Sequence, residues 1–313
     1  MGELRRADRL ITLLEPPRPA GLVSGGFRYQ ERVIEAIGAA ARRQTVSPAE
    51  LDARVSELRR RRPDEAVLVD GWFTELCAAP LPEGVIPLLH TVPRAQGWAN
   101  RHARAVATSQ RTAEQVRGAD GAVAVVRPGV DACFTPRPRT GDGTFALVCA
   151  GAVCEAKGQR RLVEALRGVV LPWRLTLVGS RTAPAEELAD VDRASEGLPV
   201  TVRDAVAPEE LAALYAEHDL FVTLSRDESF GMAAAEAVAA GLPLVATDTG
   251  ELATLGRDEA RWLLPVDADE RVVRAQLHDL IARPDELRAL RGRSAAPVRT
   301  WRDAAAELVA ALA

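Results

Sequence analysis

Two glutamates stand on either side of the start of an apolar helix pattern. Glu228 precedes Phe230 and Gly231, and Glu236 lies inside the run of small or apolar residues from Met232 to Ala240. A helix that is apolar on all sides is buried. A carboxylate within such a helix is costly unless a partner satisfies it. The pattern therefore predicts a ligand site at this helix N-terminus, for a molecule that carries both hydroxyls and phosphates.

The one lysine of the chain is a second chemical signal. Lys157 stands alone among 40 basic residues, the rest being arginine. Its presence suggests a place that needs a compact ammonium rather than a planar guanidinium, with chance as the alternative. Lys157 and Gly158 follow Gly151, which ends an apolar strand pattern, so the lysine is expected at the carboxyl edge of a sheet.

The helix amides complete the predicted site. Unpaired N–H groups and the helix dipole bind phosphate, so the amides of Phe230, Gly231 and Met232 could hold a diphosphate together with the lysine. Glu236 could accept hydrogen bonds from a ribose diol, and Glu228 from sugar hydroxyls. These groups together describe a site for a nucleotide-sugar. Taken alone, Glu228 could equally be an acid placed by the helix dipole. For Glu236 a buried structural pair is the lesser alternative.

Composition excludes several function classes. The chain has 313 residues, a net charge of −4, 47% hydrophobic residues and 27% charged residues, which indicates two ordinary globular domains and disfavours a nucleic-acid binder. The cysteines show no metal-ligand spacing and are expected to be reduced structural thiols, which favours the cytoplasm. No membrane span or leader is expected, and at most a peripheral membrane contact. The basic run Arg59–Arg62 fits a solvated helix C-terminus better than a lipid patch.

The elements that must position these residues form two strand–helix series. Apolar strands are predicted at 9–14, 66–69, 85–89, 105–108 and 122–126, with helices at 29–41 and 109–116. A second series has strands at 145–150, 174–178, 200–202, 220–224, 244–246 and 262–264. Its helices are predicted at 157–167, 185–196, 208–216, 270–282 and 284–293, besides the one that carries Glu236. Short apolar strands alternating with helices predict parallel sheets covered on both faces.

The predicted domains follow from these series. Residues 1–135 form an acceptor-side domain, 136–143 a linker rich in Pro, Gly, Arg and Thr, and 144–300 a nucleotide-sugar-binding domain. Residues 301–313 form a helix that could pack back on the first domain. The fold class is α/β, with two doubly wound, Rossmann-like domains facing across a cleft, and ligands at the carboxyl ends of the strands.

At this point the chain resembles a known family, the retaining GT-B glycosyltransferases of the family 4 type. Glu228 and Glu236 look like its E-x7-E signature, and the resemblance spans nearly the whole chain. The further motifs that carry it, in the order of the chain, are Ser24-Gly25-Gly26, His90-Thr91, Arg127-Pro128-Gly129-Val130-Asp131, Gly151 with Lys157-Gly158, and Ala240-Gly241-Leu242-Pro243.

The resemblance implies transfer of a sugar from a nucleoside-diphosphate-sugar, most simply a UDP- or GDP-sugar, to a small-molecule or lipid-linked alcohol. It implies retention at the anomeric carbon without a metal ion or other cofactor. His90, Lys157 and Glu228 would be catalytic, by positioning and charge stabilisation. Donor binding would fall to Gly25, Gly26, Gly151, Lys157, Phe230, Gly231, Met232 and Glu236.

Two features depart from the family pattern. The family has an arginine directly after the first glycine of the phosphate turn, where this chain has Ala152. Arg94, Arg127 and Arg160 are the candidate substitutes for this second cation. The first domain is also short.

These departures keep a second hypothesis open, a non-catalytic GT-B-like subunit that binds a nucleotide-sugar or a partner. A nucleotide-sugar epimerase is a third hypothesis. A dinucleotide oxidoreductase is disfavoured because no G-x-G-x-x-G follows the first strand of either series. A pyridoxal-phosphate phosphorylase is disfavoured because its Schiff-base lysine would have to be Lys157, which is already assigned to the phosphate turn.

Overall fold

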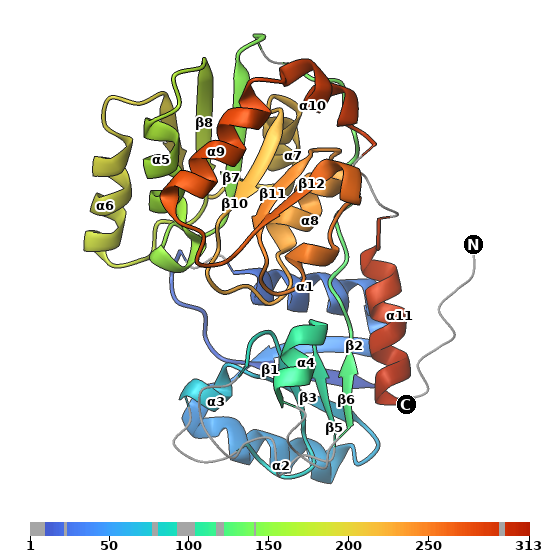
Figure 1. Cartoon of the computed structure of the whole chain (residues 1–313). Coiled ribbons are helices and arrows are strands. Elements are labelled where there is room, and N and C mark those ends of the chain that lie inside the picture. The colour runs from blue at the N-terminus through green and yellow to red at the C-terminus, as the bar shows by residue number, and fades with distance from the viewer. Residues whose placement is uncertain are drawn as a thin grey trace. The chain divides into compact units, whose positions relative to one another are not determined.

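The computed structural model describes residues 10–21, 24–76, 81–92, 104–116, 122–140, 142–293 and 298–313. The described chain divides into two compact units (Figure 1). The first unit comprises residues up to 20, 25–129 and 299–313, and the second comprises residues 130–298 together with Gly21 and Ser24. The comparison below is made unit by unit.

The first unit is a parallel six-stranded sheet in the order β2-β1-β3-β4-β5-β6. Its strands are β1 (Ile11–Glu15), β2 (Ala41–Thr45), β3 (Ala66–Asp70), β4 (Ile86–Leu89), β5 (Arg104–Ala107) and β6 (Ala122–Val125). Its helices are α1 (Gly25–Ile37), α2 (Leu51–Arg61), α3 (Phe73–Leu76), α4 (Gln110–Val116) and α11 (Trp301–Leu312). From β1 the chain adds β2 on one side and then β3 to β6 on the other. The topological switch point of this sheet therefore lies between β1 and β3.

The helices of the first unit form because each buries one apolar stripe. On α2, Leu51, Val55 and Leu58 recur at helical spacing and pack on Leu14 and Val67 of the sheet. The three arginines of its last turn suit the helix dipole. The basic run is therefore a helix C-terminus, as predicted.

The C-terminal helix α11 packs against α1 within the first unit. Its start is fixed by a capping box, in which Thr300 accepts from the Asp303 amide and Asp303 accepts from the Thr300 amide. The ring of Trp301 meets that of Tyr29 edge to face at a centroid distance of 5.9 Å. Gly129 passes so close that a Cβ there would lie 2.3 Å from the Trp301 nitrogen. Only glycine fits where these two segments cross.

The second unit is also a parallel six-stranded sheet, in the order β12-β11-β10-β7-β8-β9. Its strands are β7 (Phe145–Ala150), β8 (Trp173–Val178), β9 (Val200–Arg203), β10 (Leu220–Thr223), β11 (Leu244–Thr247) and β12 (Arg261–Leu264). Its helices are α5 (Gln159–Arg167), α6 (Ala185–Ser195), α7 (Pro208–Ala216), α8 (Met232–Ala239), α9 (Glu270–Ile281) and α10 (Pro284–Leu290). Here the switch point lies between β7 and β10.

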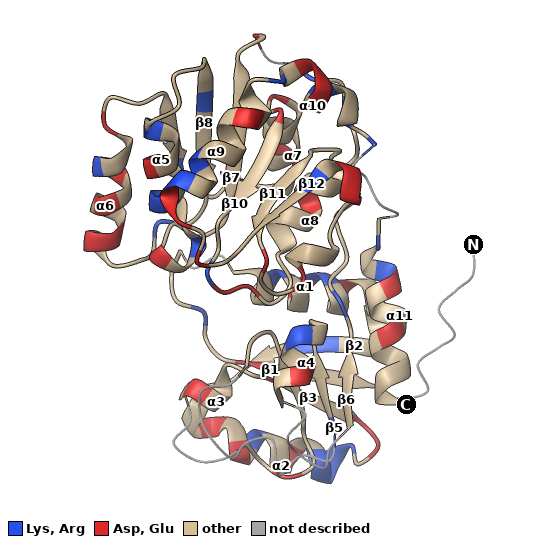
Figure 2. Cartoon of the chain, viewed as in Figure 1, with Lys and Arg blue, Asp and Glu red and all other residues tan. Residues whose placement is uncertain are grey.

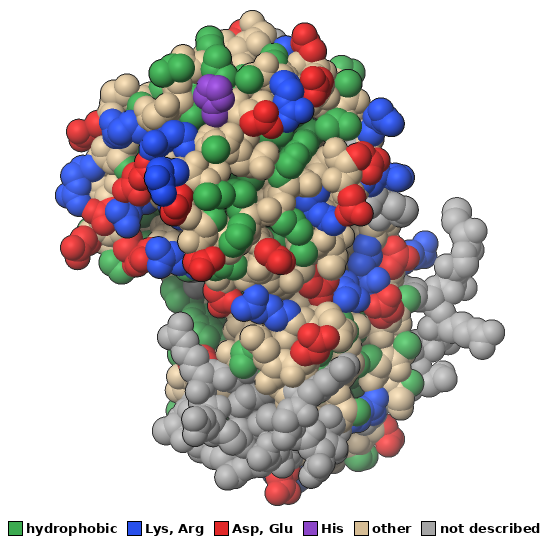
Figure 3. Space-filling view, in the orientation of Figure 1, with side chains coloured by type: hydrophobic (Ala, Val, Ile, Leu, Met, Phe, Trp, Pro, Cys, Tyr) green, Lys and Arg blue, Asp and Glu red, His purple; other side chains and the backbone are tan. Residues whose placement is uncertain are grey.

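Helices cover both faces of this second sheet, which explains why its inner strands β7, β10 and β11 are apolar. Phe145, Leu147 and Cys149 of β7 face a core shared with α5, α6 and α9. Val148, between them, faces the core shared with α7 and α8. Along β7, β10 and β11 the ribbon carries no charged residue (Figure 2). On the face of the molecule drawn in Figure 3, charges of both signs are interspersed.

The boundary between the units differs from the predicted one. Val130 and Phe134 are buried in the core of the second unit, where the Phe134 ring lies 5.9 Å from that of Tyr215. Burial of these apolar side chains assigns residues 130–135 to the second unit rather than to the first. The C-terminal boundary falls at 298/299 instead of 300/301.

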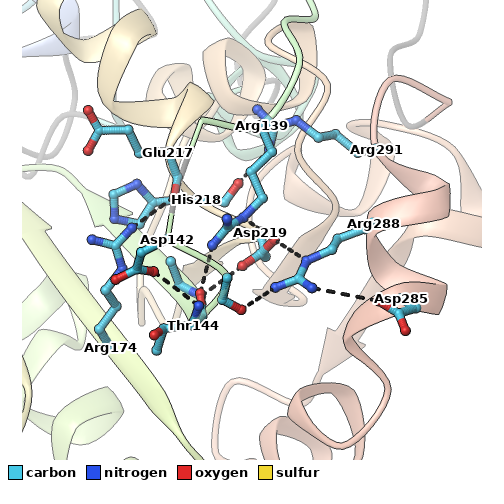
Figure 4. Close-up of polar contacts among 12 residues, drawn as sticks. Arg139, Asp142, Thr144, Arg174, Glu217, His218, Asp219, Asp285, Arg288 and Arg291 are labelled. Atoms are coloured by element: carbon cyan, nitrogen blue, oxygen red, sulfur yellow. Dashed lines mark hydrogen bonds and ion pairs between the residues drawn. The ribbon is translucent and has the colours of Figure 1, made fainter.

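The segment predicted as a linker is fastened to the second unit. The guanidinium of Arg139 forms an ion pair with Asp219 at 2.7 Å, and the Thr140 amide donates to the Ala216 carbonyl at 3.1 Å. Asp219, just ahead of β10, also pairs with Arg288 of α10 and accepts from the Ala146 amide (Figure 4). Its carboxylate therefore ties together the segment, the sheet and α10 at the amino ends of the strands.

Candidate donor-binding site

Lys157 and Glu228 meet at the carboxyl edge of the second sheet. The Lys157 Nζ donates to Glu228 Oε2 at 2.5 Å, and the two side chains are 29% and 18% exposed. Lys157 follows β7 and Glu228 follows β10, so the pair sits at the switch point of this sheet. Ligands of doubly wound sheets bind at that position. Two residues 71 positions apart in the chain are thus hydrogen bonded. The sequence analysis predicted that they bind the diphosphate and the sugar of a donor.

The loop that carries Lys157 is held by glycines. Gly158 has φ +71°, and a Cβ there would lie 2.3 Å from the Leu224 carbonyl oxygen after β10. Gly179, after β8, approaches so closely that its Cβ would lie 1.8 Å from the Gly151 oxygen. Three loops of one edge therefore touch through their backbones. A side chain on Gly158 would push the Lys157 loop away from the loop that leads to Glu228, and one on Gly179 would push the loop after β8 away from Gly151.

The N-terminus of α8 lies next to Glu228. Gly231 caps the helix with φ +88°, and a Cβ there would be 3.6 Å from the Glu228 Cγ. The Ala235 amide donates to the Gly231 carbonyl at 3.0 Å. By helix geometry the amides ahead of Ala235, including that of Met232, have no acceptor inside the helix. Amides at the start of a helix can bind an anion, and α8, with eight residues, has two turns to support them.

Glu236 is buried, with 2% exposure, on the second turn of α8 among the alanines of the helix. The sequence predicted this burial. Phe230, just before the helix, is 9% exposed and joins the same core, so its side chain anchors the loop while its backbone reaches the helix start.

A residue that the sequence analysis missed supports the Glu228 loop from behind. Gly250, after β11, has φ +60°, and a Cβ there would lie 2.1 Å from the Glu228 carbonyl oxygen. The next amide, of Glu251, donates to the Ser229 carbonyl at 3.1 Å. A glycine between Thr249 and Glu251, just after an apolar strand, was the available signal, but its contact is visible only in three dimensions.

A layer of hydroxyls lies beneath the same loop. Thr223 and Ser225 are hydrogen bonded through their hydroxyls at 3.0 Å, and the Thr247 hydroxyl donates to the Ser225 carbonyl at 2.5 Å. All three residues are buried. Buried hydroxyls that bond one another fix the path of the chain between β10 and Glu228.

Of the predicted substitutes for the second cation, Arg160 lies in the described part of the second unit. Arg160 pairs with Glu164 on the exposed side of α5 at 3.0 Å. Arg127 belongs to the first unit, and Arg94 lies outside the described residues. Arg226 is a better candidate that the sequence analysis did not name. It precedes Glu228 by two positions, and its amide donates to the Ala156 carbonyl at 2.8 Å, next to Lys157.

The first unit holds the remaining predicted residues, Gly25, Gly26 and His90. Gly25 begins α1. A Cβ on Gly26 would lie 3.0 Å from Cγ and Cδ2 of His90, so this glycine makes room for the imidazole. His90 follows β4 and lies 3.1 Å, Nε2 to Nε2, from Gln30. Burial lowers the pKa of His90, although the carboxylate of Asp70 opposes the shift.

Three global findings complete the description. Among the described residues no group of three or more His, Cys, Asp or Glu could hold a metal ion. No helix of the described chain is both long and apolar enough to span a membrane.

Cys133, Cys149 and Cys154 are free thiols, and burial raises the pKa of the Cys149 thiol to about 12. Cys77 lies outside the described residues.

Comparison with known families tests what the second unit is. Residues 144–282, which include Lys157, Glu228 and Glu236, match the family described as glycosyl transferases group 1. The match covers the edge where Lys157 and Glu228 meet.

Curated relatives point the same way over part of their length. The chain is 37% identical over 172 residues to the D-inositol 3-phosphate glycosyltransferase of Pseudarthrobacter chlorophenolicus, which covers 46% of this chain and 39% of that one. It is 32% identical over 240 residues to the enzyme of the same name from Xylanimonas cellulosilytica, covering 65% and 55%. The chain thus spans about half the length of these relatives or less.

Solved structures match over nearly the whole chain. Sucrose-phosphate synthase from Thermosynechococcus elongatus superposes with a TM-score of 0.75 at 17% identity, covering 96% of this chain and 97% of that one. Anabaena HepE, solved with UDP-glucose, superposes with a TM-score of 0.70 at 15% identity, covering 96% and 98%. These likenesses, with two parallel six-stranded sheets, establish the GT-B fold. The predicted α/β fold class is confirmed.

Proposed function

We propose that this chain is a retaining glycosyltransferase that moves a sugar from a nucleoside-diphosphate-sugar to an alcohol, with no metal ion or other cofactor. The observation that carries the proposal is the Lys157–Glu228 pair, at the switch point of a glycosyl transferases group 1 domain. A cation for phosphate and an acceptor for hydroxyls are thereby joined at the edge where such a sheet binds ligands.

The residues have separate roles in this proposal. When the donor binds, the Lys157 ammonium turns to the diphosphate, and Glu228 accepts hydrogen bonds from sugar hydroxyls. The amides of Gly231 and Met232 add neutral donors to the phosphate, and Glu236 receives the ribose diol. His90 meets a hydroxyl of the transferred sugar.

The chemistry follows from these placements. The bond from the anomeric carbon to the phosphate oxygen breaks, and a bond to the acceptor hydroxyl oxygen forms on the same face. The hydroxyl proton leaves with the nucleoside diphosphate. Charge grows on the departing phosphate, where preorganised donors lower the barrier most. We assign the second cation to Arg226, because its backbone bonds to the residue before Lys157. Its side chain is 60% exposed, and its 3.7 Å pair with the exposed Glu155 would give way to a phosphate.

Acceptor and donor identities are narrower parts of the proposal. UDP-glucose bound to HepE supports a UDP-sugar, with a GDP-sugar as the other choice. The names of the curated relatives support a phosphorylated cyclitol as acceptor, and a lipid-linked alcohol is the alternative. The three free thiols support a reducing, cytoplasmic setting.

The experiment begins with a screen of UDP-, GDP-, ADP- and TDP-sugars, which reads the melting temperature of the protein. Turnover is then measured with the donor that stabilises it, in the presence and absence of a chelator. The anomeric configuration of the product is read by NMR. We expect transfer with retention that the chelator leaves unchanged.

Variants test the site itself. Lys157→Met and Glu228→Gln should each lower kcat by about 10²–10³-fold, as loss of one preorganised donor or acceptor does. Arg226→Ala should raise the donor KM more than it lowers kcat. Arg160→Ala is the control and should stay within about twofold of the parent, because the pair of Arg160 with Glu164 lies on the exposed surface of α5. Normal rates in both Lys157 and Glu228 variants would contradict the assignment. Donor binding without transfer to any acceptor would instead favour the non-catalytic alternative.

A further inference from the structure

A chain of three polar side chains lies at the switch point of the first sheet. Gln30 comes from α1, which follows β1. Asp70 ends β3, and His90 follows β4. The Gln30 Nε2 lies 2.6 Å from Asp70 Oδ2 and 3.1 Å from His90 Nε2. Gln30 is fully buried and Asp70 is 2% exposed, whereas His90 is half-buried.

The carboxylate of Asp70 fixes which way the Gln30 amide points. The other carboxylate oxygen, Oδ1, accepts from the Trp72 amide at 2.9 Å, which holds the carboxylate in place as an acceptor. An amide nitrogen only donates and an amide oxygen only accepts. Turning the amide over would set its oxygen against Asp70 Oδ2 at hydrogen-bond distance, with no hydrogen between them. The nitrogen must therefore face Asp70.

The same nitrogen then dictates the state of His90. Its second hydrogen points to His90 Nε2, and a donor cannot face a protonated ring nitrogen. Nε2 must carry the lone pair, so in the neutral imidazole the hydrogen is on Nδ1. The lowered pKa of His90 agrees with a neutral ring.

Two contacts hold the ring in this position. Gly26 packs on one side, leaving no room for a Cβ. The Tyr29 ring meets the imidazole edge to face at a centroid distance of 5.4 Å. The ring is thus restrained by neighbours from α1 as well as by its hydrogen bond.

We propose that Gln30, oriented by Asp70, is a positioning residue that keeps His90 in the neutral Nδ1–H form, so that His90 presents a hydrogen-bond donor to a hydroxyl of the sugar. The contact between His90 and the sugar rests on the proposed function, whereas the protonation of His90 follows from Gln30 and Asp70 alone. His90 then acts as a neutral donor, neither a base nor a cation for phosphate.

The test is a long-range ¹⁵N–¹H NMR spectrum of the histidine rings in the whole chain, assigned by single His→Gln variants. His218 is an internal reference. Its Nδ1 lies 2.7 Å from the Leu214 carbonyl and its Nε2 2.9 Å from the Thr176 hydroxyl. A carbonyl only accepts, so Nδ1 of His218 carries the hydrogen. We expect His90 to show the same Nδ1–H pattern as His218. An Nε2–H or doubly protonated His90 at neutral pH overturns the inference.

Variants separate positioning from mere packing. Gln30→Glu keeps the size and brings a second carboxyl group to about the distance of the present bond to Asp70. The two carboxyl groups would share one proton, which leaves no hydrogen to point at His90 Nε2. His90 should then gain a hydrogen on Nε2, and kcat should fall about 10-fold or more. Asp70→Asn frees the amide to turn over, so His90 should show both tautomers. Gln44→Glu is the matched control. Gln44 only accepts, through Oε1 from Arg54 at 2.6 and 2.9 Å, and a carboxylate satisfies that contact, so the His90 signals should not move.

The outcomes keep the two proposals apart. If no donor and acceptor pair is turned over, the transferase assignment fails while the tautomer result stands. If the chain transfers sugar and Gln30→Glu leaves both the His90 spectrum and kcat unchanged, the positioning role of Gln30 is refuted and the transferase assignment stands.

Discussion

The backbone contact between Gly158 and Leu224 gives a prediction whose size can be worked out. In Gly158→Ala two costs add. The left-handed φ of +71° costs a non-glycine residue about 1–2 kcal/mol. The new Cβ also meets the Leu224 carbonyl oxygen at 2.3 Å, and such overpacking costs about 1–3 kcal/mol. We expect a loss of about 2–5 kcal/mol in the free energy of unfolding.

Gly197 separates these two costs. It has φ +72°, and no atom lies within 4 Å of the Cβ that alanine would add. Gly197→Ala should therefore lose only the conformational part, about 1–2 kcal/mol. The difference between the two variants, measured by urea unfolding in one buffer, isolates the contact with Leu224.

Activity adds a second measurement. The displaced carbonyl in Gly158→Ala belongs to the loop that leads to Glu228, and the displaced alanine adjoins Lys157. A shift of about 1 Å in either loop should lower turnover about 10²-fold, whereas Gly197→Ala should leave it unchanged. Equal stability and equal turnover in the two variants would show that the Lys157 loop and the loop after β10 are not held together through Gly158.

Two further predictions concern the amino edge of the second sheet. Asp219→Ala should lower the free energy of unfolding by about 3–5 kcal/mol, because it leaves Arg139 and Arg288 without their buried carboxylate. In the control Asp279→Ala, calorimetry should show no such loss, because the pair of Asp279 with Arg283 is exposed. An equal loss in both variants would refute the role of Asp219. Burial lowers the pKa of His218 to about 4, below the value of an unfolded histidine. The unfolded chain therefore takes up the proton first as pH falls, and stability should decrease by about 3 kcal/mol between pH 6.5 and 4. In His218→Gln that part of the pH dependence of urea unfolding should disappear, and an unchanged slope would contradict the assignment.

Apolar patterning predicted most strands of the two sheets because the inner strands, such as β1, β3, β7, β10 and β11, are buried on both faces. Apart from β2, every strand in the first unit overlaps an apolar run of the sequence, and so does every strand in the second. The edge strand β2 was missed, and its first residue, Ala41, was assigned to the preceding helix. Four of its five residues are polar and none of the five is buried. Arg42 and Arg43 pair with Glu65 and Glu15. An edge strand held by ion pairs carries no alternation of apolar residues to detect.

The candidate site was predicted where chemistry is local in the sequence. Glu228, Gly231 and Glu236 lie on one short segment, and Lys157 was noticed because it is the one lysine of the chain. Gln30, Asp70 and Gly250 could not be found in that way. Each acts through a contact with a residue 20 or more positions away, and the type of residue says nothing about which partner it will meet.

The passage of the chain through the first unit has a consequence for biosynthesis. The helix α11, which packs on α1, follows the whole second unit in the chain. On the ribosome, residues 130–298 are therefore synthesised before α11. The usual order, in which the N-terminal domain folds first, is reversed at this last step. Until α11 has been made, the side of α1 that contacts it stays uncovered. Ribosome-bound chains that end near residue 298 should therefore recruit chaperones.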